Sequence, residues 1–387
     1  MDSYYVKPRI YMEREGLNEI LKGRSKALII TDKFMYESGK VNYVTDICLR
    51  MGVEVSIFAE VKPDPDIATI TNGITQMTNF KPDVLFALGG GSAIDCAKAM
   101  NYLAAKEGMM EKAFFVAIPT TSGTGSEVTS FAVISDPDAK AKYPLISDDL
   151  LPEAAVLDAE LTKTVPASIT ADTGIDVLTH AIEAYVSVKA NDFTDAAAEK
   201  SMKIVFEHLE QAVKAASKKP EELTPEDLRH RQKMHNASCL AGMAFSNAGL
   251  GINHSMAHAL GGHFHIPHGR ANGILLPYVM QFNCGCKTSL TPASDRYARM
   301  SKVLWLDSGT HRENAFGTIR ATKQLVKRVG IPKTIKDQGV KEKDFMDALD
   351  GLVEAALADS CTATNPKIPT REEMRELFLT AYKGNNM

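Results

Sequence analysis

Residues 83–106 read DVLFALGGGSAIDCAKAMNYLAAK, and this stretch decides the fold of the N-terminal part. It begins with an apolar run that is typical of a strand buried on both faces of a sheet. Three glycines follow, and the remainder carries apolar residues at the i, i+3 and i+4 spacing of a helix. The stretch therefore predicts a buried strand, a tight turn and a helix in direct succession.

Similar apolar runs recur through the first 165 residues, with helix-like segments between them. The runs are KALIITD (26–32), VEVSIF (53–58) and AFFVAIPTT (113–121). Strands that alternate with helices in this way predict a parallel sheet covered by helices on both faces. The N-terminal stretch MDSYYVKPRIYM lacks the apolar core of a secretory signal and looks more like an edge strand.

After about Pro166 the strand-like runs disappear. Long segments of helix-favouring residues replace them, as in TDAAAEKSMKIVFEHLEQAVKAA (194–216). The chain has 387 residues, which is more than one hydrophobic core usually serves, so two domains are expected. We assign residues 1–165 to an α/β domain and residues 166–387 to an all-helical domain.

The composition excludes several classes of function. A net charge of −4 gives no electrostatic basis for binding nucleic acid or an anionic membrane. No apolar run in the sequence is long enough to cross a bilayer. The six cysteines are scattered, which favours reduced thiols in the cytoplasm over disulfides. Cys284 and Cys286 have no second pair at zinc-binding spacing, so we interpret both as ordinary thiols.

The glycine turn in LGGGSAIDCAK (88–98) is the first of two predicted nucleotide-binding turns. Gly90 and Gly91 allow close backbone approach, and the following helix N-terminus offers N–H groups to a pyrophosphate. Ser92 and Asp95 suit the first turn of that helix. The alternative is a tight strand-to-helix turn that binds nothing, because the pattern is not the G-x-G-x-x-G fingerprint.

The second turn, IPTTSGTGSEVT (118–129), also follows a strand. Its hydroxyl groups, including those of Thr120, Thr121 and Thr124, can bond the phosphates or ribose of a nucleotide. Ligands of open α/β sheets bind at the carboxyl ends of the strands, where both turns are expected. Asp32 ends an earlier strand, where an acidic residue can bond a ribose 2′-hydroxyl and repel a 2′-phosphate. The alternatives are a surface loop rich in hydroxyls and an ordinary turn aspartate.

The histidines are concentrated in one place, because five of the ten lie in INHSMAHALGGHFHIPHG (252–269). An earlier helix-like segment carries Asp176 and His180 at i, i+4 spacing, which places both on one helix face. His254 and His258 repeat this spacing. A carboxylate and three imidazoles from two helices and a loop can form a four-coordinate site for zinc or ferrous iron.

Spacing alone does not select the metal ligands among the five histidines of this stretch. His268 follows a turn at IPHG, and His263 and His265 lie just before it. His263, His265 and His268 are therefore all candidate ligands.

Five motifs, taken in order, resemble the iron-dependent alcohol dehydrogenase family over nearly the whole chain. They are GGGSAIDCAKA (89–99), IPTTSGTGSEVT (118–129), TADTGIDVLTHAIEAY (170–185), AGMAFSNAGLGINHSMAHALGGHFHIPHGRANGILLPYV (241–279) and TNP (364–366). Within the family, ISDPDAKAKYPL (134–145) and KMHNAS (233–238) are most similar to the 1-propanol dehydrogenases of propanediol-utilisation microcompartments. The chain also resembles the alcohol dehydrogenase half of aldehyde–alcohol dehydrogenases.

The resemblance implies a Rossmann-like N-terminal domain, a helical C-terminal domain and an active site in the cleft between them. The metal ligands that it implies are Asp176, His180, His254 and His268. The cofactor-binding residues that it implies are Asp32, Gly90, Gly91, Ser92, Asp95, Thr120, Thr121, Thr124 and Lys142. His258 matches a further histidine near the nicotinamide, whereas His263 and His265 match no ligand.

The implied activity interconverts a short-chain primary alcohol and its aldehyde with NAD(H). The leading pairs are propionaldehyde/1-propanol and acetaldehyde/ethanol. Fe²⁺ is the expected metal, Zn²⁺ suits the same site, and either polarises the substrate oxygen. We expect His258 to relay the proton, and the alternative is that it only positions the nicotinamide. Phe131 and Phe245 are candidates for an apolar substrate pocket, with plain core packing as the alternative.

Other functions are compatible with the same arrangement of motifs. A diol oxidoreductase of the same family, acting on lactaldehyde or 1,3-propanediol, is the first alternative, and a zinc glycerol dehydrogenase is a further one. A sugar-phosphate cyclase would need cationic residues, which TGIDVLTHAIEAY and GLGINHSMAH lack. A nucleotide- or metal-sensing protein would not need an open metal site. We expect a homodimer or larger homo-oligomer in the cytoplasm, with residence in a microcompartment, and contact with its shell or enzymes, as an extension.

Overall fold

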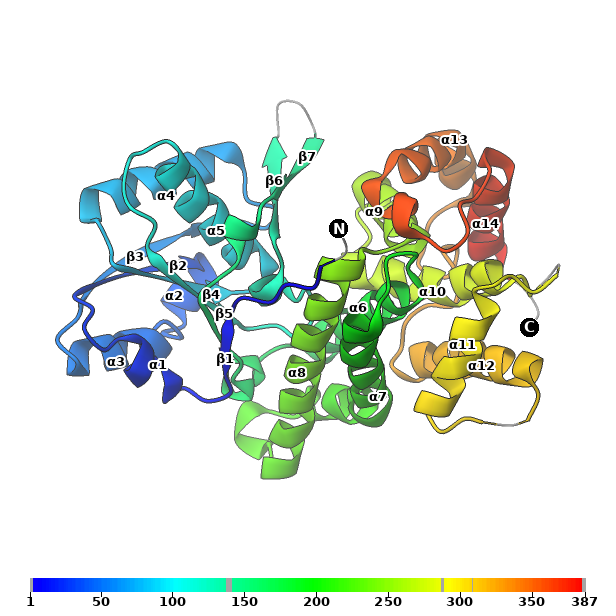
Figure 1. Ribbon diagram of the computed structural model, residues 1–387, viewed down its shortest axis with the longest axis horizontal. Coiled ribbons are helices and arrows are strands. Elements are labelled where there is room, and N and C mark those ends of the chain that lie inside the picture. The colour runs from blue at the N-terminus through cyan, green and yellow to red at the C-terminus, as the bar shows by residue number, and fades with distance from the viewer. Residues whose placement is uncertain (1–2, 137–140, 287–288, 308, 385–387) are drawn as a thin grey trace. The chain divides into compact units, whose positions relative to one another are not determined.

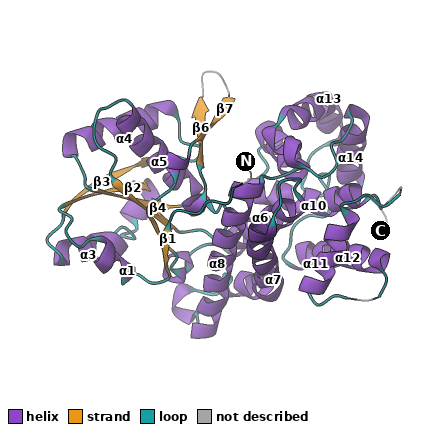
Figure 2. Ribbon diagram, viewed as in Figure 1, coloured by secondary structure: helices purple, strands orange, loops and turns teal. Residues whose placement is uncertain are grey.

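A computed structural model describes residues 3–136, 141–286, 289–307 and 309–384, and Figure 1 traces the chain. The chain divides into two compact units, one formed by Tyr5–Thr164 and one by Met1–Tyr4 together with Val165–Met387. All strands of the described residues lie in the first unit, and the second unit is helical (Figure 2).

The first unit is built on a six-stranded sheet in the order β1-β8-β5-β4-β2-β3, and each neighbouring pair is parallel. The strands are β1 (Arg9–Tyr11), β2 (Lys26–Asp32), β3 (Glu54–Val61), β4 (Val84–Gly89), β5 (Phe114–Pro119) and β8 (Ala154–Val156). The short β1 lies at an edge, as the N-terminal stretch predicts.

Helices cover both faces of this sheet because side chains alternate along each strand. In β2, Ala27 and Ile29 belong to one core, which α1 (Gly16–Ile20), α2 (Lys33–Glu37) and α3 (Asn42–Arg50) complete. Leu28 and Ile30 belong to a second core with α4 (Ile67–Phe80) and α5 (Gly91–Lys106). Figure 1 shows α4 and α5 on the side of the sheet opposite α1 and α3. The apolar run of β2 therefore reflects burial on both faces.

The carboxyl ends of adjacent strands bring the two predicted nucleotide-binding turns together. Gly89 at the end of β4 pairs with Pro119 at the end of β5. The chain after each strand therefore leaves from the same edge. A Cβ atom placed on Gly91 would lie 2.9 Å from Cγ2 of Thr124, so glycine is needed where α5 begins against the second loop.

A two-stranded antiparallel sheet is absent from the sequence prediction, as is the short strand β8. It consists of β6 (Phe131–Asp136) and β7 (Ala141–Ile146), in register from Phe131 opposite Ile146. The signal is weak because β7 contains Pro144, and proline lowers the strand propensity of a segment.

The second unit consists of nine helices among the described residues. They are α6 (Ala167–Val186), α7 (Asp192–Ala215), α8 (Pro225–Ala248), α9 (Ile252–Phe264), α10 (His268–Cys284), α11 (Ser294–Val303), α12 (His311–Arg328), α13 (Glu342–Ala358) and α14 (Arg371–Lys383). Capping boxes begin α7, α8, α12 and α14, with Asn191, Thr224, Thr310 and Thr370 as N-caps. In the described part of the chain, every helix is too short or too polar to cross a membrane.

This architecture confirms the predicted fold class, an α/β N-terminal part with a parallel sheet followed by a helical C-terminal part. The predicted strands at 26–32, 53–58 and 113–121 correspond to β2, β3 and β5, and the strand predicted at the start of 83–106 corresponds to β4. The helical stretch at 194–216 corresponds to α7, which runs from Asp192 to Ala215.

Candidate active site

Three helices bring one carboxylate and three imidazoles together in the second unit. Asp176 and His180 lie one turn apart on α6, His254 lies in the first turn of α9, and His268 is the first residue of α10. Each side chain offers one ligand atom, and these four atoms all lie within 4.8 Å of one another. The two helices and the turn that the sequence analysis grouped thus converge on one point.

The donor set fits a divalent metal ion. Asp176, His180 and His254 are buried, whereas His268 is exposed, so three donors are shielded from water and the fourth faces solvent. Nε2 of His254 is buried and makes no hydrogen bond within the described residues. Its distance to Oδ1 of Asp176 is 3.6 Å, too long for one. A metal ion would satisfy this nitrogen, and imidazole with carboxylate suits Fe²⁺ and Zn²⁺.

The charges within the group are strongly coupled. Burial raises the pKa of Asp176, but the imidazoles of His180, His268 and His254 outweigh burial and hold that pKa well below its usual range. Burial likewise lowers the pKa of His254, but the carboxylates of Glu183 and Asp176 outweigh it and raise that pKa to about 9. The electrostatic field of the site therefore favours a positive charge among these four side chains.

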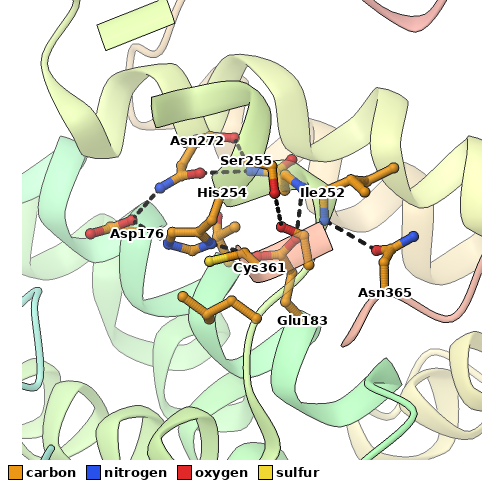
Figure 3. Close-up of polar contacts among 12 residues, drawn as sticks. Asp176, Glu183, Ile252, His254, Ser255, Asn272, Cys361 and Asn365 are labelled. Atoms are coloured by element: carbon orange, nitrogen blue, oxygen red, sulfur yellow. Dashed lines mark hydrogen bonds and ion pairs between the residues drawn. The ribbon is translucent and has the colours of Figure 1, made fainter. Parts of the chain in front are cut away.

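Buried amides hold Asp176 in place (Figure 3). Nδ2 of Asn272, one turn along α10 from His268, donates to Oδ1 of Asp176 at 2.7 Å. Nδ2 of Asn253 donates to Oδ1 of Asn272 at 2.8 Å, which links α9 to α10. Because an amide that donates to Asp176 cannot accept its proton, the arrangement favours the ionised carboxylate.

A ring contact orients His180. The ring of Phe245 on α8 stacks on that of His180, with centroids 4.4 Å apart. Phe245 is buried, and it packs against a predicted metal ligand. Phe131 lies in β6 of the first unit, and both phenylalanines stay predictions as lining of a substrate pocket.

The start of α9 is anchored by the TNP segment. Oδ1 of Asn365 accepts from the backbone N–H of Ile252 at 3.3 Å, and Nδ2 of Asn365 donates to Oδ1 of Asn283 at 2.8 Å. Figure 3 shows Asn365 beside Ile252. A Cβ atom on Gly251 would lie 2.6 Å from Oδ1 of Asn365 and 2.7 Å from Oε1 of Glu183. The absence of a side chain at residue 251 therefore permits the close approach that places His254.

His258 lies one turn beyond His254 on α9 and outside the four-residue group. Its Nδ1 lies 2.8 Å from Oδ2 of Asp359, and its ring stacks on His268 with centroids 5.3 Å apart. Burial raises the pKa of Asp359, but the His258 ring and the backbone N–H of Cys361 outweigh burial and lower it to about 2. His258 is therefore held beside a predicted ligand by an ionised carboxylate, and its side chain is 43% exposed.

The predicted cofactor residues lie in the first unit, and all of them except Lys142 lie at or after the carboxyl ends of β2, β4 and β5. Oγ1 of Thr121 would lie 3.4 Å from a Cβ atom on Gly90, so the two turns are in contact. Thr120 is buried and donates its backbone N–H to the carbonyl of Gly89. Ser92 is partly buried in the first turn of α5.

Asp95 and Asp32 have structural partners as well as predicted roles. Asp95 accepts from Oγ of Ser126 at 2.6 Å and from the backbone N–H of Val133 at 3.0 Å, so it ties α5 to the second loop. Asp32 is the N-cap of α2 and accepts from the backbone N–H of Met35 at 2.9 Å. Lys142 lies in β7, but its side chain is outside the described part of the chain.

No role in the site is assigned from the sequence to four residues that the structure places there. Glu183, Asn272, Asp359 and Asn365 contact predicted ligands, the histidine beside them or the helix that carries them. Glu183 falls seven residues after Asp176 on the same helix face, so its spacing was a usable signal.

The remaining histidines of the cluster lie outside the four-residue group. His263 is exposed near the end of α9, where its ring contacts Phe264 edge-on, and His265 caps that helix in a left-handed conformation with φ 55°. The structure thus separates His254 and His268 from the other histidines of the stretch, which spacing alone does not do.

Two families of known sequences match the chain and together cover most of it. Residues 8–159 match the family described as iron-containing alcohol dehydrogenase. Residues 170–382 match the C-terminal region of the Fe-containing alcohol dehydrogenase family.

Individual relatives differ in length. The chain is 42% identical to an aldehyde-alcohol dehydrogenase of Streptococcus pneumoniae over 97% of its own length but only 45% of that protein. It is 44% identical to the 1-propanol dehydrogenase PduQ of Citrobacter freundii, over 98% of this chain and 99% of that one. It is 40% identical to an NADPH-dependent butanol dehydrogenase of Clostridium saccharobutylicum, over 99% of both chains. The chain thus spans about half of some relatives and nearly all of others.

Solved structures show the same fold. A 1,3-propanediol oxidoreductase has a TM-score of 0.88 and 33% identity, over 99% of this chain and 100% of that one. A sulfoacetaldehyde reductase from Bifidobacterium kashiwanohense, solved in complex with NAD⁺, has a TM-score of 0.85 and 26% identity, over 100% of both chains.

The approach of α10 to α6 generates a prediction at Gly269. A Cβ atom there would lie 2.2 Å from the backbone oxygen of Asp172 and 3.2 Å from Cβ of Asp176. Gly269→Ala must therefore push the start of α10, with His268, away from Asp176. We expect the affinity for Zn²⁺, measured by competition with a chromophoric chelator, to fall about tenfold or more, and stability to fall by about 1–3 kcal/mol.

Gly262→Ala is the matched control, because a Cβ atom on Gly262 in α9 meets nothing within 4 Å. It should retain the wild-type metal affinity. Unchanged affinity in Gly269→Ala would show that the position of His268 does not depend on this close approach.

Proposed function

Because the chain belongs to the iron-containing alcohol dehydrogenase family, we propose that it interconverts a short-chain primary alcohol and its aldehyde with NAD(H). The expected pairs are propionaldehyde/1-propanol and acetaldehyde/ethanol. The observation that carries the proposal is the convergence of Asp176, His180, His254 and His268, with a buried Nε2 on His254 that makes no hydrogen bond in the described structure.

These four side chains would hold one divalent ion, with Fe²⁺ as the expected metal and Zn²⁺ as a second that suits the donors. An ion held there would supply Lewis-acid chemistry toward the substrate oxygen in both directions of the reaction. Among these four side chains only that of His268 is exposed, and we infer that substrate reaches the ion past this residue.

The first unit would bind the cofactor, which carries the hydride. The N-terminus of α5 after Gly90 suits the pyrophosphate, because its N–H groups and helix dipole favour an anion. The hydroxyls of Thr121 and Thr124 lie against this turn. The NAD⁺-bound structural neighbour supports this assignment at the level of the fold.

His258 would move the proton between the substrate oxygen, or a cofactor ribose hydroxyl, and water. A carboxylate only accepts hydrogen bonds, so the contact with Asp359 occupies the Nδ1 proton and leaves Nε2 to exchange a proton. The partly exposed side chain gives contact with solvent. Asp359 thus acts as a positioning residue for His258, in the manner of a carboxylate that orients a catalytic imidazole.

A 1,3-diol oxidoreductase is the second candidate function. The structural similarity to 1,3-propanediol oxidoreductase, with a TM-score of 0.88, favours it. The similarity to the 1-propanol dehydrogenase PduQ, over 99% of that protein, instead favours a substrate with a single hydroxyl group. Similarity to PduQ also supports residence in a propanediol-type microcompartment, and a homodimer or larger assembly is proposed with it. Fractionation of purified microcompartments and sedimentation of the purified protein test these two points.

The metal requirement tests the proposal directly. We expect anaerobic chelator treatment to abolish NADH oxidation with propionaldehyde, and Fe²⁺ or Zn²⁺ to restore it. His268→Ala should lower kcat/KM at least about 100-fold, because a metal contributes several kcal/mol to such a reaction. His263→Ala is the matched control, since His263 is exposed and outside the ligand group.

Three outcomes decide between the candidates. Faster turnover of 3-hydroxypropionaldehyde than of propionaldehyde would favour the diol reading. Full activity of the chelated protein would contradict the role of the metal. Absence of turnover with every short aldehyde, with NADH or NADPH, would reject the dehydrogenase itself.

Asp32 generates a prediction about the cofactor. Asp32→Asn keeps an oxygen for the cap bond to Met35 but removes the negative charge. Repulsion of a 2′-phosphate should then weaken, so kcat/KM with NADPH relative to NADH should rise about tenfold, or about 1.4 kcal/mol. Asp83→Asn is the control, because Asp83 precedes β4 at the opposite edge of the sheet. An unchanged ratio in Asp32→Asn would remove this residue from cofactor selection.

A substitution at His258 distinguishes a proton relay from a residue that only positions the nicotinamide. A proton relay requires kcat to fall about 100-fold in His258→Ala with little change in the KM for NADH. In Asp359→Asn the amide nitrogen would face Nδ1 of His258. We therefore expect kcat to fall in this variant as well, while the amount of bound metal stays constant. A rise in the KM for NADH with unchanged kcat would show that His258 only positions the nicotinamide.

A further inference from the structure

Glu183 uses both of its carboxylate oxygens inside the helical unit. It lies on α6, seven residues after Asp176, and only 3% of its surface is exposed. Oε1 accepts from the backbone N–H of Asn253 at 2.7 Å, and Oε2 lies 2.5 Å from Nδ1 of His254 (Figure 3). One buried carboxylate therefore holds both the first turn of α9 and the imidazole that this turn carries.

The contact with Glu183 decides which nitrogen of His254 is free. An ionised carboxylate can only accept, so Nδ1 of His254 carries a proton and donates it to Oε2. The lone pair of the neutral ring then belongs to Nε2, the nitrogen nearest Oδ1 of Asp176 at 3.6 Å. A metal bound by imidazole needs this lone pair.

We propose that Glu183 is a positioning residue for the metal, which fixes the ring and the tautomer of His254 so that Nε2 faces the ion. The inference rests on the proposed metal site and adds a residue that is not one of its four ligands. The same side chain has a second role, because it caps α9 by accepting from the N–H of Asn253. The test has to separate the two roles.

Glu183→Gln separates them because the amide has one acceptor and one donor end. The backbone N–H of Asn253 can donate only to the oxygen end of the amide, so the amide nitrogen must face Nδ1 of His254. Nδ1 then has to accept, and the proton of the neutral ring moves to Nε2, inside the metal site. The variant therefore keeps the bond that caps α9 but loses the tautomer of His254 that leaves Nε2 free for the metal.

Metal binding to the apoprotein is the readout, measured with Zn²⁺ by chelator competition and with Co²⁺ by its visible absorption. Substitution of a carboxylate that orients a histidine ligand typically costs about 10- to 100-fold in metal affinity, and we expect a loss in this range for Glu183→Gln. The Co²⁺ spectrum should change as well, because a ligand is misoriented. Glu183→Asp keeps the charge but is one methylene shorter, so its loss should be smaller than that of Glu183→Gln.

Glu199→Gln is the matched control. Glu199 lies on α7, accepts from the hydroxyl of Tyr185 and is not in the ligand group, so the Glu199→Gln variant should bind metal like the wild type. Wild-type affinity and spectrum in Glu183→Gln would overturn the inference and leave Glu183 as a helix cap. If Glu183→Gln does not fold by circular dichroism, Glu183→Asp decides in the same way, and wild-type affinity there overturns the inference. A wild-type protein that binds neither ion would instead reject the proposed metal site.

Discussion

The charge of Asp176 is the constraint on which the rest of the helical unit depends. A carboxylate buried this deeply is stable only with compensating partners, and it has three imidazoles and a donating amide around it. Each partner comes from a different place on the helices. The N-terminus of α10 must lie against α6, which Gly269 allows, and the start of α9 must lie against Glu183 and Asn365, which Gly251 allows.

The same constraint explains why so much of the unit is polar and yet buried. Asn253, Asn272 and Asn283 are almost fully buried, and each is hydrogen-bonded to another amide of the network. These bonds restrict the rotamers of the side chains that they reach, and Asp176 is one of these side chains. A preorganised set of donors is what a catalytic centre requires.

Local patterns in the sequence predicted the features that depend on neighbouring residues, such as buried strands and side chains one turn apart on a helix. The apolar runs gave β2, β4 and β5 because burial on both faces leaves few polar residues in a strand. The i, i+4 spacing placed Asp176 with His180 because a single helix fixes their distance. The β6–β7 pair escaped prediction because Pro144 masks the strand signal. The partners of the ligands escaped because contacts such as His258 with Asp359, 101 residues apart, have no local signature. Selection among the five clustered histidines likewise needed the turn that carries His268 onto α6.

X-ray absorption at the zinc K-edge, on protein reloaded with one equivalent of Zn²⁺, tests the central claim most directly. The account predicts a first shell of nitrogen and oxygen only, at about 2.0–2.2 Å, with the outer scattering of three imidazoles. A sulfur neighbour at about 2.3 Å would contradict it. Such a result would place the ion at the neighbouring group of His258, Asp359 and Cys361, whose ligand atoms also lie within 4.8 Å of one another.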